Sequence, residues 1–207
     1  MRTIIYIDGF NLYYGALKNT PYKWLNIDKM CRLLLPRHQI VALKYYTAIV
    51  GARSNDPNQP VRQQTYLRAL QAIPNLTITH GQFLHSKIRM FLAHPVPGSP
   101  PYATVIKTEE KGSDVNIAAH LIHDGHRDLY DAAVVISNDS DLAEAVRIVR
   151  YDLGKIVGML NPHKRPSYAL KQHVSFVKAI RQGVLAKSQF PDTLRDVYGV
   201  FHKPADW

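Results

Sequence analysis

Four aspartates in this 207-residue chain occupy positions where their carboxylates could bind a divalent metal ion. Asp8 directly follows a short apolar run, and Asp139 and Asp141 follow the apolar run AAVVIS. Asp114 comes after Lys-Gly-Ser, where a helix is expected to begin. Clustered carboxylates repel one another unless a cation joins them, and oxygen ligands without His or Cys suit Mg²⁺ or Mn²⁺. Such ions polarise a phosphoryl oxygen and activate a bound water, so the pattern predicts phosphodiester hydrolysis.

The segments that must position these aspartates alternate between strand-like and helix-like patterns. Short runs rich in Val, Ile and Tyr predict strands at 3–7, 40–50, 76–84, 132–137 and 156–160. Periodic apolar positions predict helices at 10–18, 27–35, 61–73, 114–123 and 142–149. This alternation predicts an α/β fold in which helices cover both faces of a central, mostly parallel sheet.

A parallel sheet would bring the aspartates together, because residues just past the carboxyl ends of its strands converge in one crevice. Asp8 and the pair Asp139 and Asp141 satisfy that placement, and Asp114 can reach the crevice from a helix N-terminus. Each residue also has a purely structural explanation. Asp139 and Asp114 could cap helices, Asp141 could be stabilised by the dipole of the helix that follows it, and Asp8 could belong to a turn.

Two further regions are expected beyond the alternating core. The Pro-rich segment HPVPGSPPY separates strand-like runs at 87–92 and 102–108, which predicts a protruding β-hairpin. After residue 162 the pattern loosens into a helical turn at 167–172, a short edge strand at 174–177 and a last helix at 178–186. We therefore expect one domain over residues 1–162 and a C-terminal extension over 163–207, packed on the domain or trailing from it.

Three sequence blocks resemble, in their expected order, the signature blocks of the NYN domain, a branch of the PIN-like nucleases. The blocks are YIDGFNLYY, KGSDVNIAAHLI and VVISNDSDLAEAVRIV, and the similarity covers about residues 3–160. The resemblance implies a three-layer, Rossmann-like PIN/NYN fold and metal-dependent cleavage of RNA. It assigns the metal-binding carboxylates to these residues: Asp8 with Asn11 beside it, Asp114, Asp139 and Asp141.

The chain departs from this family pattern at two positions in the third block. The family often has Gly where this chain has Asn138, and Phe where it has Leu142. Neither change removes a carboxylate, so the departures concern the geometry of the loop.

Five residues are candidates for supporting roles, each beside a structural alternative. Asn11 could orient a water or a ligand carboxylate, or belong only to the first helical turn. Ser137 could hydrogen-bond a ligand carboxylate or simply end its strand. Lys107, Lys111 and Arg53 could contact substrate phosphates, or be solvated charges.

Two other groups could bind metal. Glu109 and Glu110 could add a ligand, although adjacent Glu residues are more often at the surface. His120, His123 and His126 follow a spacing that places two of them on one helix face, so a zinc site is conceivable, but no fourth ligand is evident.

The composition bears on partners and compartment. A formal net charge of +10 favours a polyanionic partner such as RNA, because binding phosphates releases counterions. Four tyrosines could stack on its bases: Tyr13, Tyr14, Tyr45 and Tyr46. A single cysteine, no apolar run of membrane-spanning length and no signal peptide lead us to expect a cytoplasmic protein.

Three other functions remain as alternatives. A PIN-like module could bind RNA with little catalysis, although clustered negative charge gives RNA binding no advantage. A different Mg²⁺-dependent phosphotransfer enzyme is conceivable, but Asp8 is followed by Gly-Phe rather than by the Asp-x-Asp of haloacid-dehalogenase-like phosphatases, and TOPRIM enzymes use Glu there. A small-molecule enzyme on the same scaffold is the third, and without Gly-x-Gly-x-x-Gly a nicotinamide or flavin site has little support.

Overall fold

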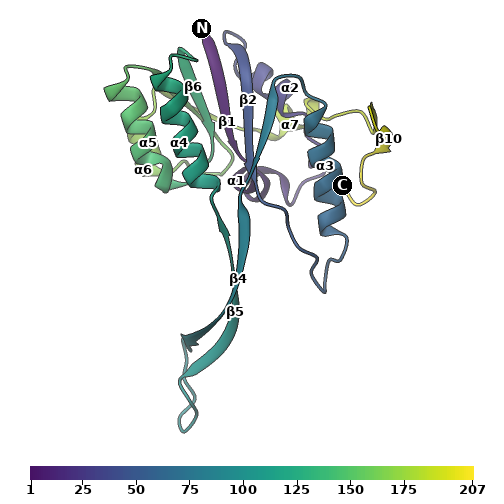
Figure 1. The fold of residues 1–207 in the computed structure, drawn as a ribbon, viewed down its shortest axis with the longest axis vertical. Helices are drawn as coiled ribbons and strands as arrows, with labels where there is room; N and C mark the ends of the chain where they lie inside the picture. Colours follow the sequence, from purple (N-terminus) through teal and green to yellow (C-terminus); the bar gives the residue numbers. More distant parts are fainter.

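A six-stranded parallel sheet forms the centre of the computed structural model, which describes residues 1–207 (Figure 1). Its strand order is β3-β2-β1-β6-β7-β8, and every neighbouring pair is parallel. The strands are β1 (Arg2–Asp8), β2 (Gln39–Thr47), β3 (Leu76–His80), β6 (Ala132–Ile136), β7 (Ile156–Asn161) and β8 (Phe176–Ala179). The strand order reverses between β1 and β6, so the carboxyl ends of these two strands flank the switch point.

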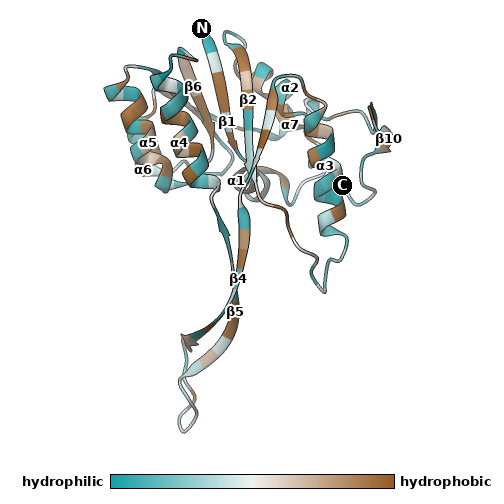
Figure 2. Cartoon of the chain, viewed as in Figure 1, coloured by the Kyte–Doolittle hydropathy of each residue, from teal (hydrophilic) through white to brown (hydrophobic).

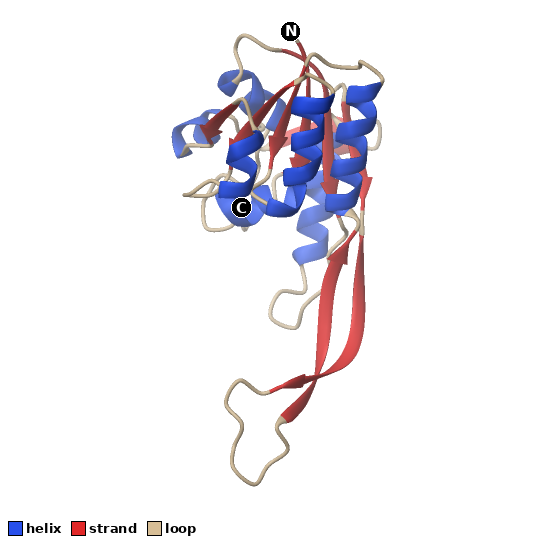
Figure 3. Ribbon diagram, turned by 90° about the vertical axis from the view of Figure 1, so that its left-hand side faces the viewer, coloured by secondary structure: helices blue, strands red, loops and turns tan.

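Helices cover both faces of the sheet and create two cores (Figure 3). One face carries α1 (Gly9–Leu12), the π-helical turn η1 (Tyr13–Leu17), α2 (Ile27–Leu34), α3 (Gln59–Gln71) and α7 (Gln182–Lys187). The other carries α4 (Ser113–His126), the 3-10 turn η2 (Ser140–Leu142), α5 (Ala143–Arg147), the π-helical turn η3 (Ile148–Asp152) and α6 (Tyr168–His173). Along β1, Ile5 and Ile7 belong to the first core, whereas Ile4 and Tyr6 belong to the second. The predicted three-layer α/β fold is confirmed.

A long antiparallel hairpin projects from the sheet as the most extended part of the molecule (Figure 1). It consists of β4 (Gln82–Phe91) and β5 (Tyr102–Lys111), which pair along their whole length. The hairpin is thus confirmed but longer than expected. Apolar residues such as Met90, Phe91 and Ile106 are exposed on this arm. The ribbon of the arm accordingly carries hydrophobic, brown stretches (Figure 2).

Two strand boundaries differ from the prediction. The strand expected at 76–84 is two strands separated by Gly81, where a side chain would collide with Lys111 O at 2.6 Å and with the Glu110 carboxylate. The strand expected at 40–50 ends at Thr47, because Gln63 then takes over the backbone groups of Ala48 and Val50 through its side chain.

The C-terminal segment both extends the sheet and covers one core. The helix expected at 178–186 was wrong at its start: Lys178 and Ala179 belong to β8, because β7 offers them an unpaired parallel edge, and α7 begins at Gln182. An unpredicted antiparallel pair follows, formed by β9 (Thr193–Asp196) and β10 (Gly199–His202). The division at residue 162 stays a prediction, but the segment after it supplies an edge strand.

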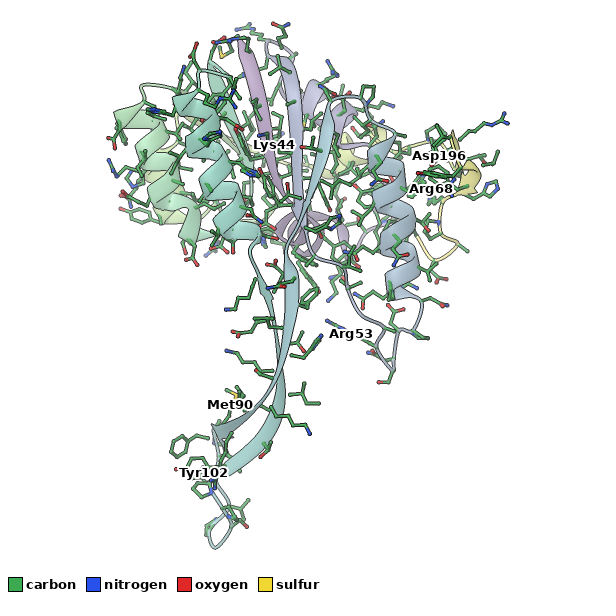
Figure 4. All side chains as sticks on the ribbon, in the orientation of Figure 1. Lys44, Arg53, Arg68, Met90, Tyr102 and Asp196 are labelled. Atoms are coloured by element: carbon green, nitrogen blue, oxygen red, sulfur yellow. The ribbon has the colours of Figure 1, made fainter.

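Aromatic side chains fix this segment against the body. Phe190, Phe201 and Trp207 pack around Trp24, whose indole nitrogen donates to Pro191 O at 2.8 Å. A two-bond ion pair between Arg68 of α3 and Asp196 of β9 reinforces the contact (Figure 4). None of the helices has the length and hydrophobicity that crossing a bilayer requires.

Candidate active site

An acidic cleft of about 380 Å³ lies where the carboxyl end of β1 meets the start of α4. Three of the four predicted aspartates line it, together with one glutamate: Asp8, Asp114, Asp139 and Glu110. Its other lining residues are Phe10, Asn11, Tyr14, Val50, Arg53, Phe83, Ser113 and His163. Asp141 is exposed and does not line the cleft.

Asp8 is the most buried acid of the cleft, with 6% of its surface exposed. One carboxylate oxygen accepts the backbone N–H of Asn11 at 2.9 Å, and the other accepts the Ser137 hydroxyl at 3.0 Å. Burial raises the pKa of Asp8 above its ordinary value, while these two hydrogen bonds oppose the rise. Asp8 therefore caps α1 and is also held rigidly from the neighbouring strand β6.

Asn11 ties together the loops that border the cleft. Its Oδ1 accepts the backbone N–H of Asn138 at 2.9 Å and lies 3.0 Å from Nε2 of His163. Since an amide oxygen only accepts, Nε2 of His163 carries the proton. Gly15 makes room for the imidazole, because a Cβ there would lie 2.8 Å from the ring.

Asp139 has both of the roles considered for it, cleft lining and capping. Its Oδ1 accepts the backbone N–H of Asp141 at 3.0 Å, which caps the 3-10 turn η2. Its own backbone N–H donates to the Ser137 hydroxyl at 3.1 Å. Asn138, where the family often has Gly, fixes this loop through hydrogen bonds to the backbones of Arg165 and Ser167.

The pKa of Asp114 shows most clearly that the carboxylates of the cleft repel one another. It lies in the first turn of α4, after Gly112 in a left-handed conformation with φ 104°. Burial first, and then the charges of Asp8 and Asp139, raise the pKa of Asp114 to about 6. Glu110 and Asp141 contribute to the same rise, so Asp141 acts on the site electrostatically from outside the cleft.

Glu110 and His163 were not among the residues predicted for the site. The sequence favours Glu110 only weakly, as an additional ligand. Its Oε1 accepts the Ser113 hydroxyl at 3.0 Å and so fixes the start of α4. The only sequence signal for Glu110 was its position four residues before Asp114, and no local pattern distinguished His163.

The predicted basic residues divide into two groups. Arg53 lines the cleft from the loop between β2 and α3, near the base of the hairpin (Figure 4). Lys107 and Lys111 lie on β5 outside the cleft lining, and both approach Glu109, at 2.6 and 3.8 Å. Arg53 is therefore the better placed of the three to meet a phosphate in the cleft.

The donor set suits a hydrated magnesium or manganese ion. No three His, Cys, Asp or Glu side chains are grouped closely enough to enclose an ion by themselves. Mg²⁺ characteristically keeps several waters and uses only one or two protein carboxylates, so one or two of Asp8, Asp114 and Asp139 suffice to hold it. For the zinc alternative, His120 Nδ1 lies 2.8 Å from the Tyr46 hydroxyl, in a hydrogen bond within the fold.

Asp114→Asn is expected to stabilise the metal-free protein by about 1 kcal/mol at pH 7.5 and to have little effect at pH 4 or below. The folded-state pKa of about 6 exceeds the ordinary 3.8, so the associated stability is complete below pH 3.8 and is lost as pH rises through 6. Partial exposure of the carboxyl reduces the effect below the full linkage value.

Denaturant unfolding at the two pH values measures this difference. Mg²⁺ should then stabilise the wild-type chain more than the variant. If the difference in unfolding free energy between the wild-type protein and Asp114→Asn does not change with pH, the neighbouring carboxylates do not raise the pKa of Asp114.

The parallel sheet, its switch point and the acids beside it define a PIN-like α/β domain. The chain belongs to the NYN domain family, whose sequence profile matches residues 2–179. The match ends at the last residue of β8 and so includes all six strands of the sheet.

Two individual proteins are similar to this chain. The 6-hydroxy-3-succinoylpyridine 3-monooxygenase HspA of Pseudomonas putida is 33% identical over 187 residues, which cover 78% of this chain and 60% of that protein. The chain thus spans less than two thirds of this curated relative. The crystal structure of a Vibrio parahaemolyticus protein of unknown function superimposes with a TM-score of 0.56 and 17% identity, covering 87% of this chain and 93% of that one. This second likeness concerns the fold alone.

Proposed function

We propose that this protein is a metal-dependent ribonuclease that hydrolyses RNA phosphodiester bonds in the acidic cleft. The observation that carries the proposal is the convergence of Asp8, Asp114 and Asp139 at the switch point of a parallel sheet. Membership in the NYN family supports the same activity. A bound Mg²⁺ or Mn²⁺ would polarise a phosphoryl oxygen and activate a water for attack.

The residues of the chain have separate roles in this proposal. Asp8, Asp114 and Asp139 would hold the hydrated ion, one or two of them directly and the rest through its waters, and Asp141 would add negative charge at the rim. Ser137 and Asn11 orient Asp8 through the two hydrogen bonds described above. Arg53 would contact the phosphate that enters the cleft, while Lys107 and Lys111 would contact phosphates farther along the strand. We place this activity in the cytoplasm on the sequence arguments alone.

Cleavage of labelled single-stranded RNA is the direct test. We expect products with Mg²⁺ or Mn²⁺ and none with chelator. Cleavage that persists in chelator would exclude the metal mechanism. Tight RNA binding without cleavage in any divalent metal would favour the alternative of an RNA-binding module.

RNA binding should weaken steeply with salt, because a chain of net charge +10 is expected to contact several phosphates. Three contacts on a single strand would lower affinity by about 20-fold between 50 and 200 mM salt. Fluorescence anisotropy across a salt series measures the slope. An affinity that does not change with salt would show that the positive charge is not used for this partner.

A second candidate is an enzyme that acts on a substituted pyridine, and the name of the Pseudomonas putida relative favours it. An aromatic pocket adjoins the acidic cleft and is lined by Phe10, Tyr13, Tyr45 and Tyr66 among others, so a flat heterocycle has a plausible place. Calorimetric titration with 6-hydroxy-3-succinoylpyridine tests this function. Absence of heat at millimolar ligand would remove the candidate.

A further inference from the structure

The aromatic pocket beside the acidic cleft lies between α1, the turn η1, β2 and α3, and Trp207 also lines it. Its volume is about 80 Å³. Phe10, Tyr14 and Val50 line both the pocket and the cleft, so the two are continuous. A ligand that enters the pocket therefore keeps another part of itself beside the carboxylates.

The walls of the pocket are suited to a flat ring. Tyr13 and Tyr14 meet edge to face with ring centroids 5.3 Å apart, and Tyr66 and Trp207 do the same at 5.6 Å. These contacts fix four aromatic side chains around a small space. Stacking on aromatic side chains is the general way in which proteins bind the bases of single strands.

Two polar groups in the pocket have no hydrogen-bond partner within the protein. The Tyr45 side chain is only 6% exposed, and its hydroxyl lies against Gly9 and makes no hydrogen bond to another group of the protein, although it is not fully enclosed. The Gln59 Oε1 atom is buried and likewise unpaired. By contrast, the Tyr66 hydroxyl donates to Leu25 O at 2.9 Å. Polar groups in such a largely covered place are normally paired, so the Tyr45 hydroxyl, whose residue lines the pocket, points to a ligand that supplies a partner.

We propose that the aromatic pocket binds the base of a pyrimidine nucleotide in the RNA strand whose phosphate occupies the acidic cleft. This inference rests on the proposed ribonuclease function and adds a base preference to it. A pyrimidine carries donors and acceptors on its edge, which can pair with the Tyr45 hydroxyl and the Gln59 amide.

The size of the pocket favours one ring over two. A closed cavity of about 150 Å³ accommodates benzene, so about 80 Å³ that opens into the cleft suits a single ring inserted in part. A bicyclic purine would require the aromatic walls to separate. Phe10 lies two residues after Asp8, which places the base near the reacting phosphate.

The test measures binding in chelator, so that it does not depend on cleavage. Labelled hexamers of uridine, of adenosine and of abasic ribose carry the same number of phosphates. We expect the wild-type protein to bind the uridine hexamer at least about 5-fold more tightly than the other two. Equal affinity for the uridine and abasic hexamers would overturn the proposal.

Tyr45→Phe removes only the unpaired hydroxyl and should reduce the uridine preference by about 3- to 10-fold. Tyr46→Phe is the matched control: this neighbouring hydroxyl pairs with His120 on the other side of the sheet, so the preference should not change. A Tyr45→Phe protein with the wild-type preference would contradict the assignment of the hydroxyl.

Two further measurements separate this proposal from the function on which it rests. RNA cleavage without a base preference would refute the proposal that the pocket binds a base, but it would leave the ribonuclease function standing. A uridine preference without cleavage in any divalent metal would support the pocket and refute the ribonuclease. Free 6-hydroxy-3-succinoylpyridine could instead bind more tightly than the uridine hexamer and lose as much affinity in Tyr45→Phe. That result would show that the pocket binds a free heterocycle and not a nucleotide of RNA.

Discussion

Asp8→Asn is expected to lower the rate of RNA cleavage by at least about 100-fold while the protein stays folded. Asn has the size of Asp but lacks the negative charge that would hold the metal, whose contribution amounts to several kcal/mol of transition-state stabilisation. Its side-chain oxygen can still accept the backbone N–H of Asn11 and cap α1. The melting temperature should therefore stay the same or rise, because the substitution also removes one repulsive charge.

Single-turnover cleavage in Mn²⁺, measured beside a thermal melt, decides this prediction. Asp131→Asn is the control, since Asp131 is paired with Arg2 at the opposite end of β1. For Asp141→Asn, we expect the cleavage rate to fall by only about 10-fold. Asp141 is exposed and outside the cleft, so it acts through its charge alone. Normal cleavage by Asp8→Asn would overturn the metal site, and a large fall in melting temperature would make Asp8 structural.

Asp124→Ala is expected to destabilise the fold by about 3 kcal/mol. Asp124 is 3% exposed, and one carboxylate oxygen receives both the Lys44 ammonium and the Tyr6 hydroxyl at 2.6 Å. Figure 4 labels Lys44 on the central sheet. The substitution leaves the largely covered Lys44 charge and the buried Tyr6 hydroxyl without their acceptor, in the core between β1, β2 and α4.

Chemical denaturation measures this loss, and two other variants control it. Asp131→Ala removes an exposed ion pair with Arg2 and should change stability little. The triple variant Tyr6→Phe, Lys44→Met and Asp124→Leu removes both charges and the hydroxyl that depends on them, and it should recover most of the stability, because replacing a buried polar group of this kind by apolar side chains is often neutral. A small effect of Asp124→Ala would mean that water reaches Lys44.

The fold was predictable from sequence wherever local pattern and tertiary placement agree. The runs before Asp8 and before Ser137 are short and apolar, which predicts buried strands, and the carboxyl ends of such strands meet at one edge of a parallel sheet. Lys178 and Ala179 were misassigned because helical propensity is weak evidence beside an unpaired sheet edge, which only the folded chain presents.

The cleft was predictable only in part, for a related reason. Asp8, Asp114 and Asp139 could be predicted because they lie at the ends of strands or the start of a helix, and sequence patterns mark these positions. Glu110 enters through the crossing of β5 over Gly81, and His163 enters through a hydrogen bond to Asn11, so both depend on contacts between distant segments. Asp141 shares with Asp139 the segment after a buried strand and the third family block, but residues two apart in a helical turn direct their side chains to different sides.

The hairpin joins the body of the protein through two neighbouring glycines. Its two strands meet the body at Gly81 and Gly112, which lie side by side: a Cβ on Gly112 would be 3.6 Å from the Cα of Gly81. Because neither residue has a side chain, the two backbone segments can approach each other closely at the base of the hairpin. Asp114 lies two residues beyond it on α4, whereas Asp8 is anchored in the sheet. Only Ser113 separates the base of the arm from Asp114, so the position of the arm and the position of one wall of the cleft are set by the same short stretch of chain.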